Sequence, residues 1–388
     1  MWHRFSRLCS EEPFRAFFPI GFVLGVAGVL LWLLFFLGAI SMYPSTVHAR
    51  LMVEGFMTCF VFGFLGTAGP RVMSVPHFSV GEVVRPSVAI LAANTLHLCG
   101  KHMLGDALFL CALVLFAASL VSRFRRREDS PPPNFALVGL GIVNGLLGAS
   151  LLVFCQATGS APNLHRVGVS LLNIGFVLLP VLGVAPFFLR RLLDLPTDNE
   201  TSTQKHWIGQ AALALVTGLA IDVSFALEVY VSHPAIGWMR FGIAAIYLGA
   251  TLPMRGHSTL AASLRLSLAS IISGLALLAV LPGYRNSALH VVFVGGFSLA
   301  IFTVATRVIL GHSGNLGLVR RRLLLLSTAL LLLVLAMISR FVADFVPTRN
   351  EHLLWGAVCW LLAASIWAVI VLPHVTRVEQ AAQAGTGA

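Results

Sequence analysis

The sequence predicts an all-α, polytopic membrane protein, and three observations carry that prediction. Hydrophobic residues make up 57% of the 388 residues and charged residues only 11%, whereas soluble domains carry about 25% charged residues. Apolar runs of about 20 residues, the length that crosses a bilayer, follow one another along the chain. The loops between these runs are short. A soluble enzyme, a disordered chain and a secreted disulfide scaffold are therefore excluded.

About twelve transmembrane helices are expected from the apolar runs. They lie near residues 17–40, 52–70, 85–100, 104–122, 135–156, 166–189, 207–230, 234–252, 263–282, 288–310, 322–345 and 353–373. The third and fourth are the least regular, because Lys101, His102 and Asp106 interrupt them. We expect residues 1–388 to form a single integral membrane domain. A polar cytoplasmic linker at 194–205 could join two halves, 1–193 and 206–388.

The basic residues are distributed unevenly between the two sides of these spans. Eighteen Lys and Arg residues fall at the termini and in the loops of one side, seven on the other side, and Arg307 inside the tenth span. By the positive-inside rule both termini are cytoplasmic. The net charge of +11 is thus explained by topology, without a nucleic-acid partner. The N-terminal stretch lacks a small-residue cleavage site, so no cleavable signal peptide is expected.

Cysteines and enzyme motifs narrow the function classes further. The six cysteines form no CxxC pair, and most lie in apolar runs, where Cys behaves as a small hydrophobe. Neither a disulfide framework nor a zinc site is expected. The chain has no Gly-rich phosphate loop, HExxH or GxSxG motif, which argues against an ATPase, a protease or a lipase.

Two patterns concern helix packing and internal organisation. Gly141 and Gly145 form a GxxxG motif, which is typical of closely packed membrane helices. Residues 43–56 (Tyr…His…Gly-Phe) resemble residues 284–297 (Tyr…His…Gly-Phe) with spacings that differ by one residue. Both segments open a span on the predicted outer face, and the similarity supports the division into two halves.

Thirteen histidines are many for so apolar a chain. His97 and His290 lie within apolar sequence, and His48 and His102 begin spans, all at the predicted outer face. Ionisable residues in membranes usually mark function, and neutral imidazole suits haem iron and copper. We therefore expect at least one metal ligand among these four. The alternative is that each caps a helix or bonds a backbone carbonyl.

Neighbouring side chains suggest how the histidines could be used. Asp106 lies four residues after His102, so its carboxylate could orient the imidazole. His48 and Met52 share a helix face and are a plausible copper pair. His97 and His102 are five residues apart, about 140° around a helix. On one continuous helix they would not bind the same metal.

Charged residues inside the spans are the remaining candidates. Arg50 and Glu54 have i, i+4 spacing and could neutralise each other. Asp222 lies deep in the seventh span, where it is protonated, paired with another span or part of a proton path. Glu228 lies nearer the outer face. It either pairs with Arg240 as a contact within the helix bundle or has a functional role.

Several segments together resemble the NnrS family. They are residues 13–18 (PFRAFF), 48–52 (HARLM) with Gly-Phe at 55–56, 183–188 (GVAPFF), 289–296 (LHVVFVGG) and 306–314 (TRVILGHSG). The last two resemble the family pattern LHxxxVGxxG…TRxxLGHTG. The resemblance covers most of the chain and agrees with twelve spans.

The resemblance implies a haem- and copper-containing protein of the bacterial inner membrane with a role in the nitric oxide response. His48 and His290 match motif histidines, and Arg307 and His312 match the distal part of the span-ten motif. Arg50 stands where the family motif has a second histidine, and the Glu that follows it is Leu51 here. The expectation is therefore haem, with copper in doubt. Arg50 could instead pair with a haem propionate.

The first functional expectation is a haem protein that binds or handles nitric oxide and protects against nitrosative stress. His48 and His290 are its leading ligands, followed by His97 and His102. If it is an enzyme, it is a haem-dependent oxidoreductase acting on nitric oxide with an unknown electron donor. The alternative is a twelve-span, proton-coupled transporter that uses Asp222, Glu228 and the histidines. A sensor that signals through a short-loop docking site is the third reading.

Overall fold

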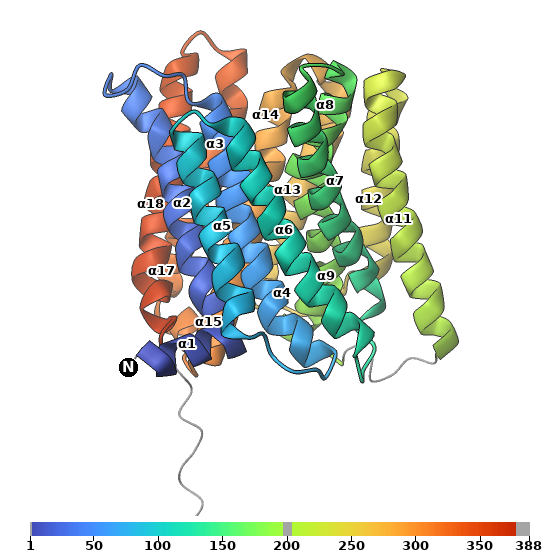
Figure 1. Cartoon of the computed structure of the whole chain (residues 1–388). Helices are drawn as coiled ribbons and strands as arrows, with labels where there is room; N and C mark the ends of the chain where they lie inside the picture. The colour runs from blue at the N-terminus through green and yellow to red at the C-terminus, as the bar shows by residue number, and fades with distance from the viewer. Residues whose placement is uncertain (1, 197–203, 378–388) are drawn as a thin grey trace, which may run out of the picture.

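The computed structural model describes residues 2–196 and 204–377, and within them every regular element is a helix. The helices stand side by side in one bundle (Figure 1). Most of their side chains are apolar, which suits a bilayer. Because the bilayer core holds no water, the backbone N–H and C=O groups must bond to each other, and within a helix they do. The expected all-α polytopic membrane fold is confirmed.

Ten helices in this part of the chain are long and apolar enough to cross a membrane. They are α2 (Phe14–Phe36), α3–η1–α4 (Ser45–Val72), α6 (His102–Arg125), η2–α7 (Pro133–Thr158), α8–η3–α9 (Pro162–Leu192), α11 (Gln204–Tyr230), α13 (Thr259–Val280), η4–α14–η5–α15 (Pro282–His312), α17–η6 (Leu323–Phe345) and α18–η7 (Arg349–His374). Two further helices, α5 (Val80–Leu98) and α12 (Ala235–Thr251), run in the same bundle. The span count of twelve and the cytoplasmic termini remain predictions.

Three of the long helices share one irregularity, a π-helical segment. The segments are η1 (Leu51–Met57), η3 (Leu171–Gly175) and η5 (Val291–Ser298). Each begins 120 residues after the previous one, at positions 51, 171 and 291. A π-helical turn is rare and often marks a functional site. The helices that contain them are the first place to look for chemistry.

The π-containing helices belong to three sets of four helices. In each set the π-containing helix packs against the helix before it, which is α2, α7 or α13. A helix pair then follows, α5 with α6, α11 with α12, and α17 with α18. The sets close into a ring, because α6 packs against α7, α12 against α13, and α18 against α2. The division into halves at 194–205 stays a prediction, and 197–203 lie outside the described residues.

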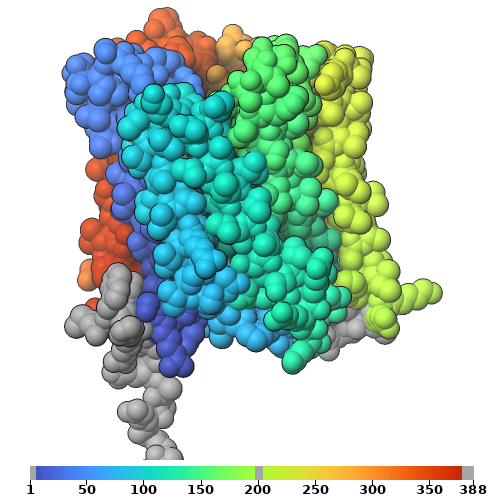
Figure 2. Space-filling view, viewed as in Figure 1, coloured from blue at the N-terminus to red at the C-terminus, as the bar shows by residue number. Residues whose placement is uncertain are grey.

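Small residues permit the close packing that the GxxxG motif predicted. A Cβ atom added at Gly141 would clash with the Pro180 ring, and one at Gly145 would lie 2.8 Å from the Phe176 side chain. Both partners are on α9 (Phe176–Leu192). On the face shown in Figure 2, side chains of neighbouring helices pack against each other along the bundle.

The two ends of the bundle are named here by the helices they carry. The α1 face is the end with the N-terminal helix α1 (Trp2–Glu11), at the bottom of Figure 1. The α3 face is the opposite end, where α3 (Ser45–Arg50), α8 (Pro162–Ser170) and α14 (Arg285–His290) begin.

Candidate functional site

A cavity of about 370 Å³ lies near the α3 face, between the three π-containing helices. Each helix contributes side chains from its π-helical segment or the turn before it. They are His48, Met52, Val53 and Met57; Ser170, Asn173 and Ile174; and His290, Phe293, Val294 and Ser298. Helices α2, α17 and α18 complete the wall. The size is in the usual range for small-molecule and cofactor sites.

His48 and His290 are the two histidines that line this cavity. The Nδ1 of His48 is 2.9 Å from the carbonyl oxygen of Gly28, and the Nδ1 of His290 is 2.6 Å from that of Asn286. A carbonyl only accepts hydrogen bonds, so each Nδ1 carries the proton and donates it. This leaves each Nε2 with a free lone pair, the arrangement found in metal-ligating histidines.

The cavity walls around the histidines are mainly apolar and aromatic. The Trp32 ring meets the His48 ring edge-on at a centroid distance of 6.0 Å, and Phe293 meets His290 in the same way at 6.0 Å. Trp360 also lines the cavity. Such walls exclude water and suit a flat, largely apolar ligand.

Three arginines, Arg285, Arg340 and Arg349, supply positive charge at the cavity. Asp344 pairs with both Arg340 and Arg349, at 3.4 and 2.8 Å. Arg285 pairs with Glu228. Within the described residues no carboxylate lines the cavity, and one aspartate cannot neutralise two arginines. The cavity therefore favours a ligand that carries negative charge.

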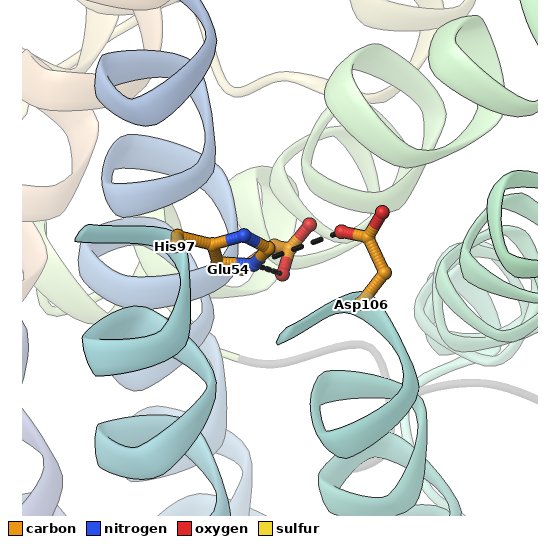
Figure 3. Close-up of side chains that lie close together, drawn as sticks. All are labelled: Glu54, His97 and Asp106. Atoms are coloured by element: carbon orange, nitrogen blue, oxygen red, sulfur yellow. Dashed lines mark hydrogen bonds and ion pairs between the residues drawn. The ribbon is translucent and has the colours of Figure 1, made fainter. Parts of the chain in front are cut away.

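A second group of polar side chains lies on the other side of η1, buried among α5, α6 and η1 (Figure 3). The Nε2 of His97 is 3.0 Å from Glu54 Oε2 and 3.7 Å from Asp106 Oδ1. Arg50 joins the two acids, with Nη1 3.0 Å from Glu54 Oε1 and Nη2 2.9 Å from Asp106 Oδ2. Glu54, His97 and Asp106 are all at most 1% exposed. We call these four side chains the buried acid cluster.

A helix break brings His102 beside the cluster, so the geometry of one continuous helix does not apply here. Gly100, at φ +72°, ends α5 in a backbone conformation that favours glycine. The chain then turns and α6 starts at His102. The Nδ1 atoms of His97 and His102 are 3.3 Å apart. Asp106, expected to orient His102, lies against His97 instead.

The buried acid cluster can hold one more positive charge. Its two carboxylates face one guanidinium, so with neutral histidines the cluster carries a net charge of −1. Glu54 Oε1 and Asp106 Oδ1 are buried without a hydrogen-bond donor of good geometry. The Glu54, His97 and Asp106 donor atoms lie close enough together to hold a metal ion. A proton balances the charge, whereas a divalent ion would add positive charge beside Arg50.

The structure thus sorts the predicted histidines into two places. His48, His290 and Met52 line the cavity. His97 and His102 belong with the buried acid cluster. It does not bring Arg50 to the cavity, since both ends of its guanidinium contact carboxylates of the cluster.

The intramembrane acids of the seventh span, α11, have separate partners. Glu228 pairs with Arg240 at 2.5 Å, the expected bundle contact, and also with Arg285 of the cavity. Asp222 accepts a hydrogen bond from Asn144 of α7 at 2.7 Å. Glu228 therefore supports the cavity wall, and Asp222 does not line the cavity.

Arg307 and His312 lie in a different cavity, near the α1 face. His312 Nδ1 donates to the Val308 carbonyl oxygen at 2.8 Å, and its ring packs on Phe14 at 5.1 Å. This is the helix-end role expected for His312. Arg340, which does line the histidine cavity, was missed as a site residue, because its i, i+4 spacing to Asp344 reads as a structural pair.

Comparison with known proteins agrees with these observations. The family described as NnrS protein matches residues 9–378, nearly the whole chain. The match includes both histidines of the cavity and all four residues of the buried acid cluster. No curated protein matches the chain. Because the family match covers far more than half of the sequence, the chain belongs to the NnrS family.

Proposed function

We propose that this protein binds haem in the cavity of His48 and His290 and uses it to handle nitric oxide. One observation carries the proposal. Two histidines from different helices line one cavity, and a backbone carbonyl fixes each Nδ1 so that each Nε2 is free. Haem iron bound there would supply a site for nitric oxide.

The residues around the histidines fit a haem. The propionate groups of haem are carboxylates, and arginine binds carboxylates through paired hydrogen bonds. In the part of the chain that the structure describes, Arg340 and Arg349 both pair with Asp344, so the cavity has positive charge to offer the propionates. The aromatic side chains Trp32, Phe293 and Trp360 would cover the ring. The propionate partner is then Arg340 or Arg349 in place of Arg50.

The protein would act in the bacterial inner membrane, with the α1 face toward the cytoplasm, and protect the cell against nitrosative stress. Nitric oxide is apolar and dissolves in the bilayer, so a cavity within the bundle is open to it. The buried acid cluster lies across η1 from the cavity and could hold a proton for any reduction of the gas. An enzymatic role would also require an electron donor.

Copper has two candidate donor sets. His48 and Met52 both line the cavity and combine imidazole with thioether, which suits copper. Glu54, His97 and Asp106 combine imidazole with carboxylates, a set that suits harder ions better. Copper is therefore proposed only for the cavity.

The test measures haem and metal content on purified protein. We expect wild-type protein to bind haem stoichiometrically, and His48→Ala and His290→Ala to lose most of it. The matched control is His257→Ala, which removes an exposed histidine outside the cavity. Haem retention by both cavity variants, or a folded wild-type protein without haem when haem is supplied, would overturn the proposal. Copper analysis of His48→Ala and Met52→Leu tests the first copper donor set.

A further inference from the structure

A second cavity, of about 510 Å³, opens near the α1 face between α4 (Thr58–Val72), α9 and α15 (Leu299–His312). We call it the arginine cavity. Arg71 of α4, Arg191 of α9 and Arg307 of α15 all line it, so each π-containing helix contributes one arginine. The proposed haem and nitric oxide chemistry uses none of them.

The three arginines follow the 120-residue repeat of the fold. Arg71 and Arg191 are 120 residues apart, the same interval that separates the π-helical segments. The next position in this series is Gly311. Arg307 lies one turn earlier, and its Nη1 is 2.5 Å from where a Cβ of residue 311 would be. The Arg307 guanidinium thus takes the third position, and glycine leaves the space for it.

Positive charge in the arginine cavity exceeds negative charge. Glu12 is the one acid that lines it among the described residues. Glu12 is already paired with the buried Arg15 at 2.5 Å and with Arg71 at 2.7 Å. Arg191 lies over the Phe187 ring at 5.3 Å, and Arg307 has no carboxylate partner within the described part of the chain. Within the described residues, the guanidinium groups of Arg191 and Arg307 are therefore without a carboxylate counter-ion.

The inner end of the arginine cavity is apolar. Phe64 and Phe188 line it, and they also line a smaller cavity of about 80 Å³. That smaller cavity is enclosed almost entirely by apolar side chains of the same three helices, such as Val61, Val184 and Ala305. A ligand could place a charged group among the arginines and an apolar group beyond them.

We propose that the arginine cavity is a binding site for a phosphate group. Arginine forms strong, paired hydrogen bonds with phosphate oxygens, and the guanidinium groups of three helices line this one cavity. Basic pockets between membrane helices commonly bind the head groups of anionic lipids. The phosphate comes either from such a phospholipid or from a soluble phosphate ester.

The test measures binding to the delipidated full chain in neutral detergent. The two probes are dihexanoyl-phosphatidylglycerol and inorganic pyrophosphate, and binding is read by calorimetry and by native mass spectrometry. We expect saturable binding that weakens about 10-fold or more in Arg191→Gln/Arg307→Gln, because charge-assisted hydrogen bonds are lost. The control is Arg320→Gln/Arg321→Gln, which removes two exposed arginines outside the cavity. Its binding should equal that of the wild type.

The pattern of binding separates the two sources of phosphate. Binding of the lipid probe alone assigns the site to a membrane phospholipid, and binding of pyrophosphate assigns it to a soluble phosphate compound. Absence of saturable binding of both probes would overturn the proposal. Equal binding by the wild type and the Arg191→Gln/Arg307→Gln variant would overturn it too. In case the double variant does not fold, the single variant Arg191→Gln repeats the comparison at an exposed residue.

Discussion

Replacing Arg50 by methionine should destabilise the protein strongly without removing its cofactor. Arg50 is the single guanidinium between Glu54 and Asp106, which are 0% and 1% exposed. Methionine fills similar apolar space but leaves two buried carboxylates without their partner. Breaking a buried ion pair by removing one member costs about 3–5 kcal/mol. For a chain of 388 residues, that corresponds to a fall in melting temperature of roughly 4–6 °C.

Two further variants test the electrostatic origin of this loss. Asp106→Asn added to Arg50→Met removes one of the stranded charges and should recover a large part of the melting temperature. Arg50→Lys should fall between the wild type and Arg50→Met, since one ammonium cannot bridge two carboxylates as a guanidinium does. Arg321→Met, at an exposed site, is the control.

The assay heats the protein and follows the loss of its monodisperse peak in size-exclusion chromatography, which gives the melting temperature. Haem content is measured on the same fractions. An unchanged melting temperature in Arg50→Met would refute the charge argument. Loss of haem from Arg50→Met at full stability would place Arg50 at the cofactor, contrary to the geometry described above.

Three other predictions concern packing, pH and proton coupling. Gly141→Ala should lower the free energy of unfolding by about 1–3 kcal/mol, because its Cβ meets a proline ring of α9. The control Gly139→Ala has open space around its Cβ and should be neutral or slightly stabilising. Equal melting temperatures of the two variants would contradict the packing described here. Burial raises the pKa of the Glu12 carboxyl, but His312, Arg15 and Arg71 together outweigh burial and hold that pKa below its usual value. Its contribution to stability is therefore complete above pH about 4.3 and lost as pH falls through the lower folded-state value. Glu12→Gln should lower the melting temperature at pH 7. Between pH 7 and pH 3 the melting temperature of the variant should fall less than that of the wild type, and parallel pH curves would contradict this. Asp222→Asn keeps a hydrogen-bonding partner for Asn144 of α7, so haem content and the nitric oxide spectrum should be unchanged. Proton-coupled uptake into vesicles by the wild type that is lost in this variant would favour the transporter alternative.

Much of the fold could be predicted because a bilayer imposes simple rules. Long apolar runs must be helices, and the expected spans coincide closely with helices such as α7, α11 and α13. The π-helical segments could not be predicted, since a shift in backbone hydrogen bonding leaves hydropathy unchanged. The similarity of residues 43–56 to residues 284–297 is the sequence feature that corresponds to them, because each of these stretches includes the start of a π-helical segment.

The candidate site could be predicted only in part. His48 and His290 were recognisable as ionisable residues at span ends, and the cavity contains both. His97 and His102 meet because the chain turns at Gly100, whose positive φ ends α5. Spacing along the chain does not give the direction of that turn. The position of Arg340 at the cavity depends on how α17 (Leu323–Val342) faces the π-containing helices. Helical periodicity shows which residues share a face, but not what that face contacts.

The most direct test of haem-based nitric oxide handling is the dithionite-reduced absorption spectrum of the purified protein, recorded before and after addition of nitric oxide. We predict a Soret band that shifts with nitric oxide in the wild type and in His257→Ala. The band should be lost or strongly reduced in His48→Ala and in His290→Ala. A haem spectrum that nitric oxide does not change, or one that survives both cavity substitutions, would contradict the account.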